Sequence, residues 1–180
     1  MKKIVIDPGH GGNDSGAVVN DMKEKNIAFD IANKLIKLLE KKGYAVMLTR
    51  NQDYNPSLSK RIDVANVIKS DLFVSIHCNG FNDTSANGIE TLYFPGSDEG
   101  EKLSGHIQAK MVDYLDMSNR GIKQRDNLFV LKYTRMPAVL CEIGFITNEF
   151  DRDKLSKKEF RYLAAESIYK GIQKYFKEWY

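Results

Sequence analysis

The chain has few cysteines and no long apolar run. Only two of its 180 residues are cysteines, Cys78 and Cys141, too few for the disulfide framework of a small secreted domain. No apolar run approaches the ~18 residues of a membrane span. The apolar stretch after Met1-Lys2-Lys3 is also too short for the core of a signal peptide. We therefore expect free thiols and neither a disulfide scaffold nor a membrane protein.

The chain also lacks a large excess of one charge. Its 27 basic and 24 acidic residues are interspersed and leave a formal net charge of +3. This balance argues against a dedicated nucleic-acid binder. With 180 residues, of which 42% are hydrophobic, the chain is long enough to build one core. We therefore expect residues 1–180 to form a single compact domain.

Hydrophobic periodicity predicts strands that alternate with helices. A strand at residues 4–6, an amphipathic helix at 25–42 and a strand at 44–48 form a β-α-β unit, in which the strands are parallel. The further predicted elements are a helix around 58–68, strands at 72–76 and 88–94, a helix around 103–115, strands at 128–131 and 138–145, and a helix at 159–177. This order predicts an α/β fold with three layers, α/β/α, around a mostly parallel twisted sheet of about six strands.

Two histidines and two glutamates are expected near one edge of this sheet. His10 follows the first strand within a glycine-rich stretch, and His77 follows the strand at 72–76. Both therefore lie at carboxyl ends of parallel strands, where sites form in open α/β sheets. Glu24 opens the first helix, and Glu142 lies near the end of a late apolar strand. Two imidazoles and one carboxylate are a ligand set of catalytic zinc, and the remaining carboxylate would act as a base.

Each of these residues also has a purely structural interpretation. Backbone hydrogen bonds could satisfy His10. The dipole of the first helix favours Glu24 by ~0.3–1 kcal/mol with no function needed. Glu142 is harder to explain in this way, because its neighbours are apolar and a buried carboxylate without a partner costs several kcal/mol. A buried ion pair is the alternative for Glu142, and we interpret His106, on the third helix, as structural.

The cysteines offer an alternative chemistry. Cys141 precedes Glu142 in a strand, so the two side chains point to opposite faces, and Cys78 stands in the same relation to His77. If the glutamate and the histidine face the site, both thiols face the core. A cysteine hydrolase is therefore disfavoured but remains an alternative. A nucleotide site is disfavoured too, since the loop after Gly9 lacks the G-x-G-x-x-G spacing.

Several motifs occur together in an order that resembles one family. They are Asp7-Pro-Gly-His10-Gly-Gly-Asn-Asp-Ser-Gly16, Glu24-Lys25, Thr49-Arg50, Arg61 with Ala65-Asn66, the stretch 72–77, Gly88-Ile-Glu90 and the stretch 136–148. From residue 3 to the final helix the chain resembles the zinc-dependent N-acetylmuramoyl-L-alanine amidases of the Amidase_3 type. These enzymes occur in bacterial autolysins and phage endolysins.

The resemblance implies a role for each candidate. The implied ligands of one Zn²⁺ ion are His10, Glu24 and His77. Glu142 would be the catalytic glutamate in hydrolysis of the amide between N-acetylmuramic acid and the L-alanine of the stem peptide. Asp7 and Asp14 are both candidates for the hydrogen-bond partner that would orient His10. The substrate would be bacterial peptidoglycan.

Further residues near this edge are weaker candidates for binding substrate. They are Gly11, Gly12, Asn13, Asn79 and Glu90. For Glu90, an ion pair with Arg50 or Arg61 is the alternative role and the favoured one.

The resemblance also suggests a setting. Without a recognisable signal peptide, we expect synthesis in the cytoplasm and action on the cell wall after release, by phage lysis or mother-cell lysis. A mildly basic surface suits an anionic wall. A C-terminal cell-wall-binding domain outside this chain is an open alternative. So is a non-catalytic wall-binding module in place of an enzyme.

Overall fold

The computed structural model describes residues 1–178 and contains one large sheet and a small hairpin. The strands of the sheet are β1 (Lys3–Pro8), β4 (Ala45–Leu48), β5 (Leu72–Asn79), β6 (Ile89–Tyr93), β7 (Asn119–Gln124) and β8 (Ala138–Phe145). The hairpin consists of β2 (Val18–Val19) and β3 (Met22–Lys23). The helices are α1 (Glu24–Lys41), α2 (Leu58–Val67), α3 (Asp98–Leu115), α4 (Phe129–Lys132), α5 (Glu149–Ser156) and α6 (Lys158–Lys177).

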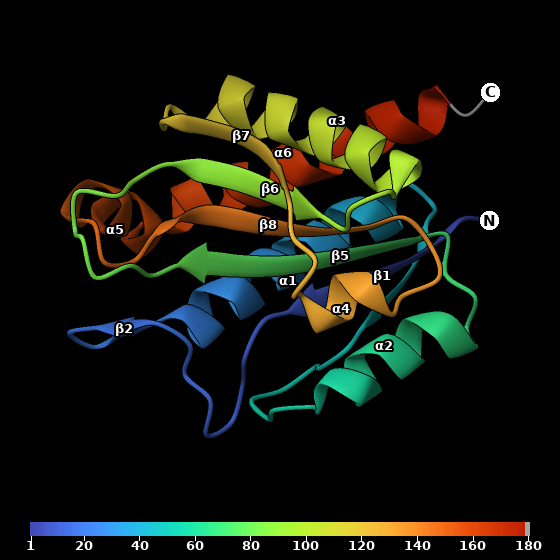
Figure 1. The fold of residues 1–180 in the computed structure, drawn as a ribbon, viewed down its shortest axis with the longest axis horizontal. Coiled ribbons are helices and arrows are strands. Elements are labelled where there is room, and N and C mark those ends of the chain that lie inside the picture. Colours follow the sequence, from blue (N-terminus) through green and yellow to red (C-terminus); the bar gives the residue numbers. More distant parts are fainter. Residues whose placement is uncertain (179–180) are drawn as a thin grey trace.

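The sheet has the strand order β4-β1-β5-β8-β6-β7 (Figure 1). Strands β4, β1, β5 and β8 run parallel, β6 runs antiparallel to β8, and β7 runs parallel to β6. The carboxyl ends of β1, β5 and β8 therefore meet at one edge of the sheet. The predicted α/β class and the mostly parallel six-stranded sheet are confirmed.

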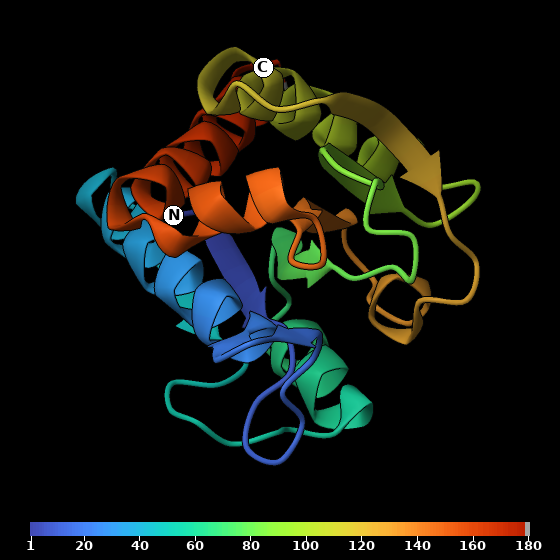
Figure 2. The ribbon, with the colours of Figure 1, turned by 90° about the vertical axis from the view of Figure 1, so that its left-hand side faces the viewer.

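Helices cover both faces of the sheet and make the two outer layers (Figure 2). The larger core lies under α1, α3 and α6, where the stripe of Ile27, Ile31 and Leu35 is buried together with Ile168 and Ile172. A smaller cluster packs the opposite face against α2 and α4. The strands β5 and β8 contribute alternate residues to the two clusters, as buried strands must.

The predicted strand at residues 128–131 is wrong. Leu128 precedes α4, and the backbone N–H groups of Leu131 and Lys132 both donate to its carbonyl oxygen, at 3.0 Å. Val130 and Leu131 are buried in the smaller cluster. A short apolar run does not distinguish a strand from a single buried helical turn, because either one places such residues in a core.

The sixth strand is instead β7, an edge strand whose sequence, Asn-Arg-Gly-Ile-Lys-Gln, contains a single apolar residue. Edge strands often carry charged side chains, so hydrophobic periodicity does not detect them. The polar helix α5 was not predicted, because it too contains few apolar residues. The β2–β3 hairpin was not predicted because strands of two residues are too short to show a periodicity.

The positions of the two cysteines agree with the alternation argument. Cys78 and Cys141 are free, buried thiols in the larger core, 2% and 0% exposed. Within residues 1–178, no helix combines the length and the apolar character that crossing a membrane requires.

Candidate metal centre and active site

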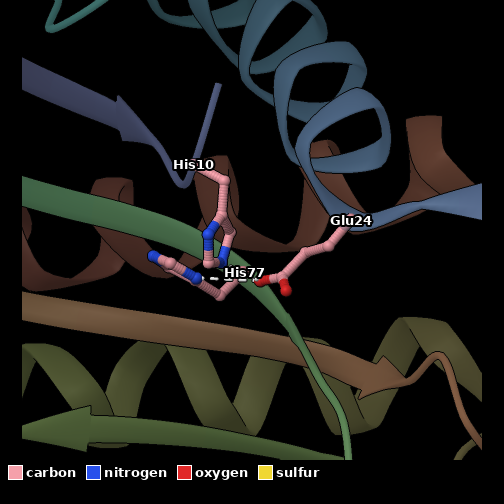
Figure 3. A group of neighbouring side chains, drawn as sticks. All are labelled: His10, Glu24 and His77. Atoms are coloured by element: carbon pink, nitrogen blue, oxygen red, sulfur yellow. Dashed lines mark hydrogen bonds and ion pairs between the residues drawn. The ribbon is translucent and has the colours of Figure 1, made fainter. Parts of the chain in front are cut away.

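Three side chains from separate segments converge at the carboxyl edge of the sheet (Figure 3). His10 lies in the loop after β1, Glu24 is the first residue of α1, and His77 lies near the end of β5. One oxygen of the Glu24 carboxylate, Oε1, lies 3.0 Å from Nε2 of His10 and 2.9 Å from Nδ1 of His77. The structure thus brings together the three predicted metal ligands, which we call the His-Glu-His cluster.

Two glycines make this convergence sterically feasible. A Cβ atom at Gly9 would lie 2.3 Å from Cε1 of His77. A Cβ atom at Gly16 would lie 2.4 Å from Oε2 of Glu24 and 2.6 Å from Cδ2 of His10. Neither position has room for a larger residue, and Gly16 also has a positive φ of 64°. The space beside the imidazoles therefore comes from Gly9 and Gly16.

Two arginines hold the loop that carries His10. Arg61 donates from Nη2 to the carbonyl oxygen of His10, at 2.8 Å, and pairs through Nη1 with Asp7, at 2.7 Å. Arg50 donates to the carbonyl oxygen of Gly9, at 3.0 Å. These contacts stabilise a backbone in which His10 has φ of +57°, a conformation that non-glycine residues rarely adopt. The sequence motifs contain both arginines but do not reveal this role, because Arg50 and Arg61 lie about 40 and 50 residues from the loop that they hold.

The orientation of the His10 ring depends on Asp14. The Nδ1 atom of His10 lies 2.9 Å from Oδ2 of Asp14, which leaves Nε2 as the nitrogen that faces Glu24. Asp7, the other candidate from the sequence, is 1% exposed and instead pairs with Arg61. A carboxylate that accepts from one ring nitrogen of a metal-binding histidine is a common arrangement, because it fixes the tautomer.

The charges of the cluster suit a cation. Burial alone would raise the pKa of Glu24, but hydrogen bonds with His10 and His77 hold it well below its ordinary value. Backbone N–H groups of Ala17 and Cys78 also donate to this carboxylate, at 2.9 and 3.0 Å. Glu24 is therefore ionised at neutral pH. Two imidazole nitrogens facing one ionised carboxylate form a donor set that fits Zn²⁺.

Glu142 lies beside the cluster with one oxygen that lacks a partner. In the sheet it is the register partner of His77 on β5 and of Glu90 on β6, so all three side chains share one face. Its Oε2 atom is buried and has no hydrogen-bond partner among residues 1–178. Burial, and then the negative charges of Glu24 and Glu90, raise the pKa of Glu142 well above its ordinary range.

The structural alternative for Glu142 was a buried ion pair. Among the described residues, Glu142 forms no ion pair within 4.0 Å. An unpaired buried carboxyl weakens a fold. A reactive site is the setting in which such a group is expected, because perturbed carboxyl groups act as acids and bases there.

The predicted ion-pair partners of Glu90 are wrong. Arg50 and Arg61 bind the loop after β1, whereas Glu90 pairs through Oε2 with Nε of Arg120 at 2.9 Å and with Nζ of Lys123 at 2.5 Å. Both partners lie on β7, the strand that the sequence did not reveal. The carboxylate of Glu90 is thus engaged in ion pairs within the sheet.

The remaining predicted substrate-binding residues lie in the loop after β1 and at the end of β5. Gly11 exchanges backbone hydrogen bonds with Asp14, Gly12 donates to Asp53 at 2.8 Å, and Asn13 is exposed. Asn79 donates from Nδ2 to Oε1 of Glu90, at 3.2 Å. Substrate binding by any of these residues stays a prediction.

A cavity opens beside the two histidines. Its volume is about 490 Å³, and its lining includes His10, His77, Arg61 and two apolar residues that are half exposed, Leu58 and Phe129. Leu58 begins α2 and Phe129 begins α4, so these two helices form the wall of the cavity. The size is in the range of small-ligand sites.

The thiols are poorly placed for nucleophilic chemistry. Burial raises the pKa of Cys141 far above its ordinary value, and it does the same for Cys78, where Glu24 and Glu142 add to the effect. Thiolates are the reactive form of cysteine. Burial and the raised pKa both disfavour either thiol as a nucleophile at neutral pH.

The fold and the site together define an α/β protein whose candidate reactive groups lie at the carboxyl ends of parallel strands. A family model described as N-acetylmuramoyl-L-alanine amidase, Amidase_3, matches residues 4–174. The chain belongs to this family, and the family identified from the sequence motifs is confirmed.

Named relatives agree with this assignment. The chain is 41% identical to the uncharacterised protein YqiI of Bacillus subtilis strain 168, over 97% of this chain and 85% of that protein. It is 38% identical to N-acetylmuramoyl-L-alanine amidase LytC of the same strain, over 97% of this chain but 35% of that protein. The chain therefore spans nearly all of one relative and about a third of the other.

Solved structures show the same fold. The N-acetylmuramoyl-L-alanine amidase of Clostridium difficile 630 matches with a TM-score of 0.93 and 36% identity, over 98% of this chain and 97% of that one. The CwlD amidase of Clostridioides difficile, solved in complex with the GerS lipoprotein, matches with a TM-score of 0.94 and 34% identity, over 99% and 100% of the two chains.

Proposed function

We propose that this amidase requires zinc and hydrolyses the amide between N-acetylmuramic acid and the L-alanine of the peptidoglycan stem peptide. One observation carries the proposal: two imidazole nitrogens converge on the Glu24 carboxylate, beside the unpaired carboxyl of Glu142. His10, Glu24 and His77 would hold the metal. Family membership and the amidase relatives support the substrate.

His10, Glu24 and His77 would hold the metal, which would supply Lewis-acid polarisation of the amide carbonyl and would lower the pKa of water. The protein provides proton transfer. Glu142 takes a proton from the attacking water and delivers it to the nitrogen of L-alanine, which leaves as an amine and needs that proton to depart. Glu142 is the register partner of His77 in the sheet, and this position supports a role for its carboxyl group beside the proposed ligands.

The test uses purified wall fragments and mass spectrometry. Digestion is expected to release new amino termini at L-alanine, and a metal chelator is expected to abolish their release. A thiol reagent is expected to leave the rate unchanged, because Cys78 and Cys141 are buried. Activity that survives chelation and is lost with the thiol reagent would instead support the cysteine alternative. Sedimentation with walls but no new amino termini would indicate a binding module.

Replacement of Asp14 by alanine is expected to lower zinc affinity by about 10- to 100-fold, because the partner that fixes the His10 tautomer is lost. Competition with a chromogenic chelator measures this constant independently of activity. Asp83→Ala is the matched control, since Asp83 is an exposed loop carboxylate that bonds locally to Ser85. Equal zinc affinities of the two variants would contradict the assigned role of Asp14.

A further inference from the structure

Two cations on the edge strand β7 share a single carboxylate. Arg120 and Lys123 both pair with Oε2 of Glu90. Hydrogen bonds with these two side chains and with Asn79 outweigh the effect of burial and lower the pKa of Glu90, which is therefore ionised at neutral pH. The trio carries two positive charges and one negative charge. We call Arg120 and Lys123 the β7 cation pair.

The exposed side of this trio is positive. The side chain of Glu90 is 7% exposed, whereas those of Arg120 and Lys123 are 35% and 30% exposed. The buried carboxylate therefore lies beneath the cations, and the cations face solvent. A second anion could approach them from outside without displacing Glu90.

Arg120 is held in place and still has a free donor. Its guanidinium lies 4.8 Å from the centre of the Phe145 ring and donates from Nη1 to the carbonyl oxygen of Asn87, at 3.2 Å. Within residues 1–178 its Nη2 group makes no hydrogen bond. Lys123 uses its ammonium for Glu90 alone in this part of the chain. An ammonium has three donors and a guanidinium has five, so the pair can bind another carboxylate.

The β7 cation pair lies at a suitable distance from the reacting bond. Glu90 is the register partner of Glu142 on the neighbouring strand, and β7 is the next strand beyond β6. Adjacent strands are ~4.8 Å apart, which places β7 about 10 Å from β8. An extended peptide covers about 3.3 Å per residue. A group one to three residues beyond the scissile amide can therefore reach the pair.

The other side of the His-Glu-His cluster has no such excess of positive charge. There Arg61 is neutralised by Asp7, and Asp14 exposes 46% of its side chain. On that side Leu58, the first residue of α2, lines the cavity, and α2 packs against β1. A carboxylate is repelled by Asp14, whereas a neutral sugar can contact the apolar wall. The site therefore has a cationic end and an end suited to saccharide.

We propose that the β7 cation pair binds a carboxylate of the stem peptide on the amine side of the scissile bond. The proposal rests on the function proposed above and adds an orientation of the substrate, in which the stem peptide extends from the His-Glu-His cluster toward β7. Two groups supply this chemistry: the free α-carboxylate of the second residue, a γ-linked D-glutamate, and the side-chain carboxylate of a diaminopimelate in third position. An amidated stem peptide lacks the corresponding charge.

Soluble muropeptides that differ in one carboxylate test this. In the first pair, one muropeptide has D-glutamate in second position and the other has its α-amide, and both have lysine in third position. In the second pair, both muropeptides have the α-amide in second position, and one has diaminopimelate and the other lysine in third position. Lys123→Gln and Arg120→Gln are each expected to lower kcat/KM about 10-fold on the carboxylate member of one pair, mainly by raising KM. On the member that lacks this carboxylate they are expected to lower kcat/KM less than about 2-fold.

Two further variants separate charge from structure. Lys123→Arg is expected to retain the preference for the carboxylate substrate, because it keeps the positive charge. Lys37→Gln, at an exposed lysine on α1, is the matched control and is expected to change nothing. The pair of muropeptides that responds identifies which carboxylate is bound.

Equal losses on the substrates with and without this carboxylate would overturn the proposal, since they would show that the cations only hold Glu90 in place. No loss on either substrate would overturn it as well. A wild-type protein that cleaves no muropeptide would contradict the proposed function instead, so the two failures are distinguishable. Thermal melting of each variant reports whether it is folded.

Discussion

Glu142→Gln is expected to lower kcat about 10³-fold while the protein retains one equivalent of zinc. General acid-base catalysis by a placed side chain contributes about 10² to 10⁴ in rate. Glutamine preserves the shape of the side chain but can neither take a proton from water nor return one to the amine. Glu142 lies beside the three proposed ligands but is not one of them, so the metal is expected to stay bound.

Zinc content by mass spectrometry and initial rates on muropeptides test this expectation. Glu101→Gln is the matched control, because Glu101 is exposed on α3, far along the sheet from the cluster. Glu142→Ala is likewise expected to retain zinc and to lose most of its activity. Loss of zinc from the Glu142 variants, or near-normal rates in them, would show that this carboxyl is not the proton carrier.

Removal of any proposed ligand is expected to abolish both zinc binding and activity. His10→Ala, Glu24→Ala and His77→Ala each delete one of three donors that lie within 4.8 Å of one another. Loss of a hydrogen-bond partner of a ligand already costs about 10- to 100-fold in affinity, so loss of the ligand itself is expected to exceed about 100-fold. Purified variants should therefore contain little zinc.

His106 provides the control for the histidine variants. It pairs with Glu178 through Nε2, at 2.9 Å, and lies on α3 against α6. His106→Ala is expected to retain one equivalent of zinc and full activity. Retention of zinc by both His10→Ala and His77→Ala, or its loss from His106→Ala, would reject the proposed ligand set.

Much of the fold could be predicted because its buried elements are periodic. The stripe of Ile27, Ile31 and Leu35 predicted α1, and the apolar run 72–76 predicted β5. The error at Leu128 and the omission of β7 have a common cause. Periodicity reports burial, and burial alone neither separates one helical turn from a strand nor reveals an edge strand.

Only part of the candidate site could be predicted from the sequence. His10 and His77 could be located because both follow predicted parallel strands. The partner of the His10 ring could not, since Asp7 and Asp14 both lie within four residues of His10 in the sequence. Their roles separate only when Arg61, 54 residues from Asp7, pairs with Asp7 and leaves Asp14 for His10.

The sequence by itself determined the α/β class, the amidase family and the four residues proposed for chemistry. It did so because local hydrophobic patterns and motif order are properties of the chain. The tertiary structure decided how these residues meet. Strand register places Glu142 between His77 and Glu90, and β7 brings the cations of Arg120 and Lys123 beside Glu90. Register and strand order depend on hydrogen bonds between distant segments, and no local pattern encodes them.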